Sequence, residues 1–311
     1  MTDEPPKRRW FQFRLRTLLI AVLVLSLPLS WFSVRMEKAR RQREAVKKIV
    51  KLGGHTYYKW ELTSGGTQPP PTWWRSLLGD DYFDKVADAG IRTRIGDAVF
   101  EQLKDLPDLE SLDLDGTQIT DAGLEHLKQL PNLNWLSLGG TQVTDTGMAN
   151  LKVLPKLRIV NLYGTRITNS GLVHLKGLTN LNYLNVGYTQ ITDAGLGRLK
   201  GLTNLEHLYF EGTQITDAGL EHLRILPCLS DLAINGTRVT AAGLGHLKEL
   251  PDLQSLSVDC SQVTAAGLKH LKGLANLKTL RVIDSQIPDA TVVELRSALP
   301  NVDVFDLPLS P

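Results

Sequence analysis

The residues of this chain that could bind a metal ion are histidines spaced by multiples of 24 residues. They are His126, His174, His222, His246 and His270. They fall in stretches with helical spacing, and neighbouring helices pack about 8–10 Å apart. That separation is too large for two imidazoles to share a zinc ion at about 2.0–2.1 Å each. No acid or cysteine recurs beside them at ligand spacing, so we expect a solvated helix face and no metal site.

The carboxylates that could form an acid–base pair are also widely separated. Asp113 and Asp115 lie together, but Glu211 follows Asp115 by four intervals of 24 residues. At roughly 5 Å per strand the gap is about 20 Å, too far for paired acid–base catalysis. The sequence also lacks a nucleophile elbow, a zinc-protease helix, a P-loop and a dinucleotide fingerprint. We therefore expect no catalytic residue, no cofactor and no small-molecule substrate.

The element that places all these residues is a 24-residue unit, first seen clearly at residues 109–130 as LESLDLDGTQITDAGLEHLKQL. Its apolar columns recur in eight copies with no polar interruption. The second leucine column is Leu112, Leu136, Val160, Leu184, Leu208, Leu232, Leu256 and Leu280. A fixed period of this length indicates a repeat architecture.

Each unit combines two periodicities. Leu112 and Leu114 alternate with polar residues, which predicts a half-buried strand. Ile119, Leu124 and Leu127 then follow helical spacing, and Thr120 stands where a helix N-cap belongs. Seven buried apolar side chains contribute roughly 10–20 kcal/mol, whereas ordering the backbone of one unit costs on the order of 24–48 kcal/mol. A single unit cannot fold alone, so the copies should stack into one solenoid.

The pattern LxxLxLxGTxITDAGLxxLxxL resembles a bacterial leucine-rich repeat, internalin-like in its period. Its TDAGL half is similar to the ribonuclease-inhibitor-like and cysteine-containing subclasses, which carry a full helix in each repeat. The resemblance implies an α/β solenoid, a right-handed horseshoe with a concave parallel β-sheet and convex helices. Threonine (Thr117 and its counterparts) replaces the usual asparagine or cysteine after the strand, so we expect a ladder of hydroxyl groups there. An F-box-like segment is missing, so a ubiquitin-ligase role does not carry over.

The variable positions beside the strand leucines should face the concave surface, because side chains alternate along a strand. Aromatic residues concentrate there in the second to fifth copies. The candidate partner-binding residues are Trp135, Tyr163, Tyr183, His207 and Tyr209 in these rows, together with Tyr188, which interrupts the column of turn glycines beside them. Aromatic side chains on a rigid surface supply large contact area at low entropy cost. The alternative is that tyrosine and tryptophan merely suit strands.

The N-terminal region predicts a membrane anchor. A basic tail at 1–16 precedes 18 uncharged residues at 17–34, TLLIAVLVLSLPLSWFSV, which is just long enough to span a bilayer as a single transmembrane helix. A cleaved signal peptide is the alternative, although no small-residue cleavage site follows the apolar run. Basic residues after the span would place the repeats in the cytoplasm, yet long domains often translocate despite nearby charge. We expect a single-pass membrane protein with the repeats on the extracytoplasmic side.

The remaining segments should connect and seal the solenoid. Residues 35–54 predict a basic juxtamembrane helix ended by Gly53 and Gly54. Residues 55–106 predict a cap with an edge strand, a proline-rich loop and a degenerate repeat, in which Trp73 and Trp74 cover the open apolar end. Eight repeats should occupy 107–299, and residues 300–311 should form a final edge strand and tail.

These observations favour a membrane-anchored module that binds a protein or peptide on its concave face and contacts the lipid bilayer through residues 17–34. The alternative is a structural envelope spacer without a specific ligand. A hydrolase with an unrecognised site is a third possibility that no motif favours. A net charge of +2 gives no indication of nucleic-acid binding.

Overall fold

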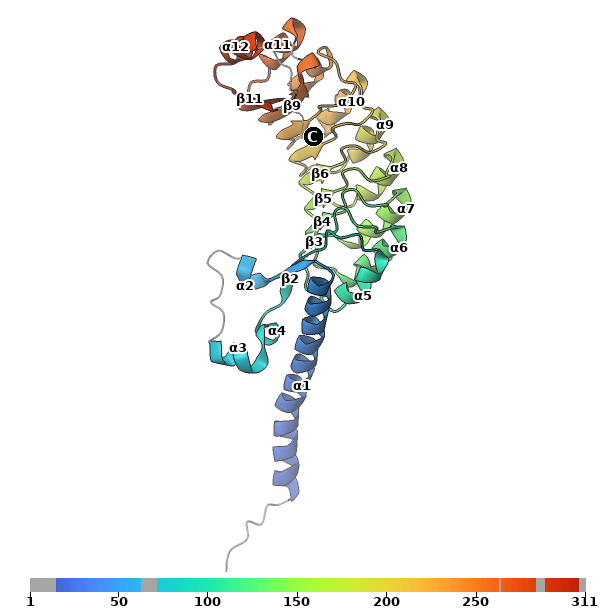
Figure 1. Ribbon diagram of the computed structural model, residues 1–311, viewed down its shortest axis with the longest axis vertical. Coiled ribbons are helices and arrows are strands. Elements are labelled where there is room, and N and C mark those ends of the chain that lie inside the picture. The colour runs from blue at the N-terminus through green and yellow to red at the C-terminus, as the bar shows by residue number, and fades with distance from the viewer. Residues whose placement is uncertain (1–14, 63–71, 263, 284–288, 308–311) are drawn as a thin grey trace, which may run out of the picture.

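The computed structural model describes residues 15–62, 72–262, 264–283 and 289–307 of the 311-residue chain. Within these ranges eleven strands form one sheet, in chain order from β1 to β11. The basic tail predicted at 1–16 lies outside the described residues except for its last two, as do the proline-rich loop and the last four residues of the chain. The chain forms an arc with the strands on its inner side and short helices on its outer side (Figure 1).

The strands are short and nearly all parallel. Only β1 runs antiparallel, against β2, and each later strand pairs in parallel with the one before it. Their bounds are β1 His55–Tyr58, β2 Val86–Gly90, β3 Ser111–Asp113, β4 Trp135–Ser137, β5 Ile159–Asn161, β6 Tyr183–Asn185, β7 His207–Tyr209, β8 Asp231–Ala233, β9 Ser255–Asp259, β10 Thr279–Ile283 and β11 Asp303–Leu307.

The predicted 24-residue register is confirmed. Leu112 pairs with Leu136, and Leu136 pairs with Val160, so the leucine column runs straight across the sheet. Leu112 and Leu136 are fully buried, together with the other apolar columns of the repeat. The core is therefore one continuous apolar column inside the arc.

The outer side is built from very short helices, which differs from the full helix expected in each repeat. A central repeat has one α-helical turn followed by a 3₁₀ segment, as in α7 Asp145–Met148 and residues Ala149–Val153. A 3₁₀ helix rises about 2.0 Å per residue, so it crosses the outer side of a short coil with few residues. The α-helices are α1 Leu15–Lys51, α2 Lys59–Leu62, α3 Thr72–Leu78, α4 Asp80–Phe83, α5 Phe100–Leu103, α6 Asp121–Leu124, α7 Asp145–Met148, α8 Asn169–Leu172, α9 Asp193–Leu196, α10 Asp217–Leu220, α11 Ala265–Leu271 and α12 Asp289–Ala298.

The threonines after the strands do not form hydroxyl bonds from coil to coil. The Thr117 hydroxyl donates to the carbonyl of Leu114, three residues earlier in the same coil, at 2.6 Å. The same bond recurs at Thr141, Thr165, Thr189, Thr213 and Thr237. Each threonine thus closes the turn of its own coil, because its short side chain reaches back along the chain rather than across to the neighbour.

One recurring set of bonds between neighbouring coils comes from the aspartate, or the asparagine at 169, that opens the outer helix. Asp121 accepts from the backbone N–H of Thr144 at 2.8 Å and from the Thr144 hydroxyl at 2.5 Å. We name this arrangement the aspartate–threonine ladder. Its other pairs are Asp97–Thr120, Asp145–Thr168, Asn169–Thr192, Asp193–Thr216 and Asp217–Thr240.

The open apolar end of the first coil is covered by α1 and not by the predicted tryptophan pair. Ala45 and Ile49 are buried and belong to the core. Trp73 and Trp74 stack on each other in α3 but stay 60% and 40% exposed, so that prediction is wrong. Both segments carry apolar residues, and α1 reaches the open end because its last turns lie against β1 and α5.

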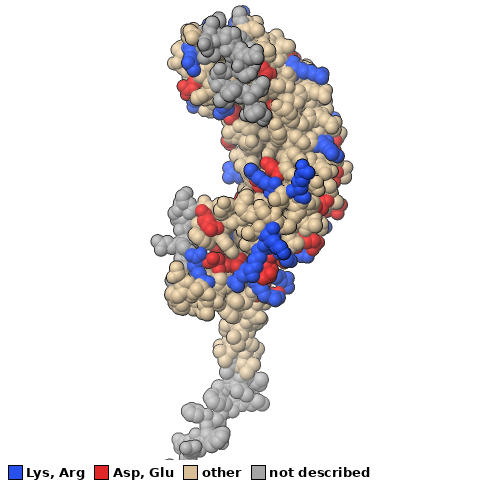
Figure 2. Space-filling view, in the orientation of Figure 1, with Lys and Arg blue, Asp and Glu red and all other residues tan. Residues whose placement is uncertain are grey.

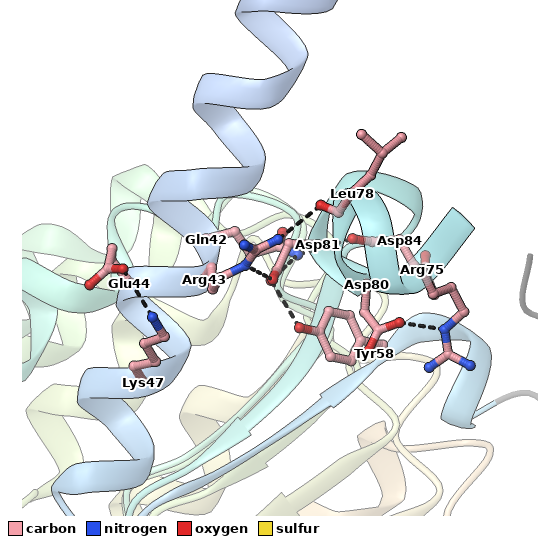
Figure 3. Close-up of polar contacts among 10 residues, drawn as sticks. All are labelled: Gln42, Arg43, Glu44, Lys47, Tyr58, Arg75, Leu78, Asp80, Asp81 and Asp84. Carbon is pink, nitrogen blue, oxygen red and sulfur yellow. Dashed lines mark hydrogen bonds and ion pairs between the residues drawn. The ribbon is translucent and has the colours of Figure 1, made fainter. Parts of the chain in front are cut away.

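A turn and a buried carboxylate fix α1 in this position. Gly53 has φ +81°, and Gly54 N–H donates to the carbonyl of Ile49, which ends α1 in a Schellman motif. Asp81 of α4 pairs with Arg43 at 3.1 Å and accepts hydrogen bonds from Gln42 and from the Tyr58 hydroxyl (Figure 3). Helix α1, strand β1 and helix α4 are therefore held together through one side chain.

The helix predicted at 17–34 is confirmed as the first half of α1, and the membrane span is not. Among the residues that the structure describes, no helix reaches the length and apolarity needed to cross a membrane. Within the predicted span, the side chains at 17–19 and 21 lie outside the described part of the chain. The edge strand predicted after α1 is also shorter than expected, because Lys59–Leu62 turns into the helix α2.

Candidate binding surface on the concave sheet

The concave surface consists of three rows of side chains that cross the strands, and Figure 2 shows the arc hollowed on this side. Sheet register sets the first two rows, since Trp135, Ile159, Tyr183 and His207 are direct neighbours across the strands. The first row is Ser111, Trp135, Ile159, Tyr183, His207, Asp231, Ser255 and Thr279. The second row is Asp113, Ser137, Asn161, Asn185, Tyr209, Ala233, Ser257 and Arg281. The third row follows the strands two residues later and includes Asp115, Tyr163, Gly187 and Glu211.

Three of the predicted residues form a cluster on β6 and β7. The Tyr183 ring lies 5.2 Å from that of Tyr209 in an edge-to-face arrangement and 6.0 Å from that of His207. All three side chains are half-buried. Burial raises the pKa of Tyr209, and the charge of Asp231, which accepts a hydrogen bond from its hydroxyl at 3.0 Å, adds to this effect. The tyrosines therefore act as neutral, pre-positioned rings.

Two further predicted residues form a separate pair at the rim of the sheet. The rings of Tyr163 and Tyr188 lie 5.0 Å apart, and both side chains are largely exposed. Tyr188 has φ +53°, the only positive φ outside glycine among the described residues. Its ring lies over Gly212, where an added Cβ would come within 2.8 Å of it. The backbone thus holds this ring outward at a cost in strain.

Trp135 stands apart from the other predicted residues. It lies in the first row on β4, and Ile159 of β5 separates it from Tyr183. Two strand spacings amount to about 10 Å. The structure therefore brings together five of the six candidate residues in two adjoining groups and leaves the tryptophan as an outlying position.

Two carboxylates in the same region were not predicted as site residues. Glu211 lies in the third row beside these tyrosines, and its Oε2 is buried without a hydrogen-bond partner. Burial raises the pKa of Glu211, and the charge of Asp231 raises it further. The sequence offered one signal for Glu211 and Asp231. Each is an acidic residue in a concave row whose neighbouring positions carry uncharged side chains.

A second polar group lies at the first repeats. Asp115 accepts hydrogen bonds from the Ser137 hydroxyl at 2.5 Å and from Gly139 N–H at 2.6 Å. Asp113 is buried and pairs with Arg92 at 2.7 Å. These carboxylates are satisfied by the protein itself, so they define the shape of the surface more than they offer charge to a ligand.

Among the histidines of the outer side, His126 stacks on Phe100 with the ring centroids 5.8 Å apart. His246 lies near Glu221 at 4.0 Å, and His174 has a pKa lowered by burial. Among the described residues no group of three or more histidine, cysteine, aspartate or glutamate side chains is placed to hold a metal ion.

Comparison with known families agrees with this geometry. The family model described as a leucine-rich repeat region matches residues 90–308. The chain belongs to this leucine-rich-repeat family. The match begins at the end of β2, so it includes all the parallel repeats that follow.

Solved structures also include similar leucine-rich-repeat proteins. An internalin (inlF) from Listeria monocytogenes is 26% identical with a TM-score of 0.49, and the match covers 58% of this chain and 49% of that one. The ectodomain of the Arabidopsis receptor kinase HAESA, solved with a peptide hormone ligand, is 18% identical with a TM-score of 0.41. That match covers 67% of this chain and 36% of the kinase chain. This leucine-rich-repeat protein thus spans about half or less of the length of these two chains, and no curated protein matches it.

Proposed function

We propose that this protein binds a protein or peptide on the concave face of its sheet. Leucine-rich-repeat proteins are typically protein-interaction modules, and the matched family model is described as a leucine-rich repeat region. The observation that carries the proposal is the two aromatic groups, Tyr183–His207–Tyr209 on adjoining strands and Tyr163–Tyr188 directly after two of the strands. Rings fixed by a rigid sheet lose little entropy on binding and bury large areas.

The strain at Tyr188 supports the same proposal. A left-handed backbone costs a residue with a Cβ roughly 1–2 kcal/mol, and strain of this kind concentrates at functional sites. The corresponding turns elsewhere use glycine. A tyrosine at this point has no role in the core, because its side chain is 57% exposed.

The test compares two variants in their capture of partners from membranes of the source organism. The first carries Trp135→Ala, Tyr183→Ala and Tyr209→Ala on the concave face. The second carries Val153→Ala and Val173→Ala, two residues of the outer side that are 48% and 45% exposed. We expect the first variant to lose the proteins that the wild-type chain enriches and the second to retain them. If both variants enrich the same proteins as the wild type, the concave face is not the binding surface and the spacer alternative is favoured.

We further propose that the first half of α1 attaches the protein to a lipid bilayer, with the repeats on the extracytoplasmic side. Leu23, Leu25, Leu27 and Leu29 are 61–71% exposed, and they point to several sides of the helix. A helix that is apolar all round needs an apolar environment. At the end of the apolar stretch Arg35 lies over the rings of Trp31 and Tyr82, a pairing suited to a membrane–water interface.

Deletion of residues 1–34 tests the attachment. The shortened chain keeps Ala45 and Ile49, so the cap of the solenoid stays complete. We expect the full chain to float with lipid vesicles and the shortened chain to stay in the soluble fraction. Flotation of both chains to the same extent would contradict attachment through α1, and protease protection of the repeats in intact cells reports the side of the bilayer.

A further inference from the structure

Glu211 is placed by Gly187, which follows the preceding strand β6. A Cβ added to Gly187 would lie 2.8 Å from Glu211 Oε2, so the carboxylate fills the space that a side chain at 187 would need. The glutamate therefore folds back over β6, toward the rings of the preceding repeats. The negative charge of Glu211 raises the pKa of both Tyr163 and Tyr183, which agrees with a position near these rings.

The charge of Glu211 has no cationic partner in the described part of the protein. Oε2 is buried without a hydrogen bond, and only the backbone N–H of Glu211 itself favours the charged form. Asp115 in the same row accepts from a hydroxyl and a backbone N–H. Burying a carboxylate without a compensating charge is unfavourable, so a cation placed beside Glu211 would recover that cost.

The neighbouring Asp231 is compensated to a greater degree. Its Oδ2 accepts from the Tyr209 hydroxyl, and its Oδ1, which is buried without a hydrogen bond, lies 3.8 Å from the cationic Arg281 Nη1. His207 Nδ1 also lies 3.8 Å from Oδ2. Arg281 is itself held by the Ser255 hydroxyl at 2.9 Å. The unmet negative charge of this surface is therefore centred on Glu211.

The rings around Glu211 restrict what can approach it. Tyr183 and Tyr209 lie on the adjoining strands β6 and β7, and Tyr163 follows β5. The faces of such rings are electron-rich. Such faces attract lysine and arginine side chains by about 0.5–2 kcal/mol, and more strongly when water is excluded. A carboxylate near aromatic rings repels an anionic group and gains nothing from an apolar one.

We infer that Glu211, together with the rings of Tyr163, Tyr183 and Tyr209, receives a lysine or arginine side chain of the bound protein or peptide. This inference rests on the proposed concave-face function and adds the chemical class of the group recognised there. The partner segment is thus basic at the position that contacts the fourth and fifth repeats.

The test measures binding of fluorescein-labelled decalysine to the full chain in nanodiscs, at low ionic strength. Decaglutamate and a neutral Gly–Ser decamer serve as reference peptides. Two variants remove one negative charge each without changing side-chain shape: Glu211→Gln on the concave face and Glu221→Gln, a 59% exposed residue on the outer side. We expect Glu211→Gln to weaken decalysine binding about tenfold or more, and Glu221→Gln to change it less than twofold. Equal loss in both variants means unselective polycation binding only and overturns the inference, as does unchanged binding in Glu211→Gln.

The pH dependence gives an independent readout. Affinity for decalysine should fall as the pH drops through the raised pKa of Glu211, because the neutral acid no longer attracts a cation. His207, Asp231, Arg281 and the surrounding tyrosines face the same site and are present in both proteins. The difference between wild type and Glu211→Gln therefore isolates the glutamate. Identical pH profiles for the two proteins would overturn the inference.

This failure is distinguishable from failure of the concave-face proposal. If the triple alanine variant loses its native partners while Glu211→Gln binds decalysine like Glu221→Gln, the partner is bound without a cation at Glu211. If Glu211→Gln weakens decalysine binding while the triple variant keeps its native partners, the cation site is real and the surface that binds those partners lies elsewhere.

Discussion

Tyr188 takes a backbone conformation that glycine takes in the equivalent turns of other repeats. Gly116, Gly140, Gly164, Gly212 and Gly236 have φ between 63° and 70° at the corresponding positions. The turn therefore has the same geometry in the absence of a side chain, and the strain belongs to the tyrosine alone. Its retention costs stability and gains an exposed ring beside Tyr163.

We expect Tyr188→Gly to raise the free energy of unfolding slightly, by up to about 1 kcal/mol, because it removes the left-handed strain. The same change should weaken partner capture. Urea denaturation followed by circular dichroism gives the first quantity, and capture from membranes gives the second. Lower stability together with full capture would show that the ring serves the fold.

At the scale of single side chains, the sequence predicted positions better than interactions. The rows that contain Tyr183 and Tyr209 follow from strand alternation, and the structure has them where expected. The exposure of Tyr188 followed from its break in the glycine column. The state of Glu211 did not follow, since its burial depends on the space at Gly187, in a different repeat. Comparing the residues at one position of the repeat cannot reveal a contact with a different position in another repeat.

The elements of the solenoid are joined by the aspartate–threonine ladder. In the sequence, Asp121 and Asp145 are explained by their place in the first turn of their own helices. The sequence therefore gives no separate sign of the hydrogen bonds that they accept from the next coil. Asn169 stands at the same position and keeps both bonds, accepting from Thr192 N–H and donating to the Thr192 hydroxyl. The requirement of the position is thus a forked polar side chain rather than a charge.

We expect Asp145→Asn to be tolerated within about 1 kcal/mol and Asp145→Ala to cost roughly 2–3 kcal/mol, because alanine leaves the Thr168 N–H and hydroxyl without their partner. Urea denaturation of the two variants measures the difference. Similar losses for both would mean that charge, and not the pair of bonds, stabilises the position.

The glycine two residues after a ladder position makes room for the ladder side chain of the preceding coil. A Cβ on Gly195 would lie 2.5 Å from Asn169 Oδ1 and 2.8 Å from the fully buried Ile191, whereas one on Gly177 would meet nothing within 4 Å. These glycines therefore permit the close approach of neighbouring coils. The identity of the group that approaches was not predictable, since the ladder itself was not.

Gly195→Ala should therefore destabilise the protein by about 1–3 kcal/mol, although alanine ordinarily favours a helix over glycine. Gly177→Ala should change stability by less than about 0.5 kcal/mol. Thermal unfolding of the two variants checks the contrast, and a stabilising Gly195→Ala would refute the steric argument.

The whole molecule depends on how its first coil is closed. The stacking of repeats follows from the apolar columns, but the choice of cover does not. The sequence offers two apolar candidates for the same end, and only the tertiary contacts of α1 decide between them. The Schellman turn at Gly53, readable from the glycine pair, gives α1 the reversal that allows β1 to pair with β2.

We expect Ile49→Ala to cost about 2–5 kcal/mol, because the side chain is fully buried in the first coil. Val50→Ala, at a neighbouring side chain that is 55% exposed, should cost less than about 0.5 kcal/mol. Hydrogen exchange should show the loss first in β2 and β3, since end repeats of a solenoid open most easily. Uniform loss across all repeats would indicate that the cap is not a local unit.

Helix α1 is continuous from Leu15 to Lys51, and its last turns belong to the core of the arc. A flexible tether would let the arc turn freely about its attachment, whereas this helix continues unbroken through Pro28, the one proline within it. A bilayer or protein that binds the first half of the helix therefore also fixes the direction in which Tyr183 and its neighbours face. Inserting one residue into the helix between its bound half and the arc would rotate the arc by about 100° around the helix axis. The same rings would then face a different part of the surroundings.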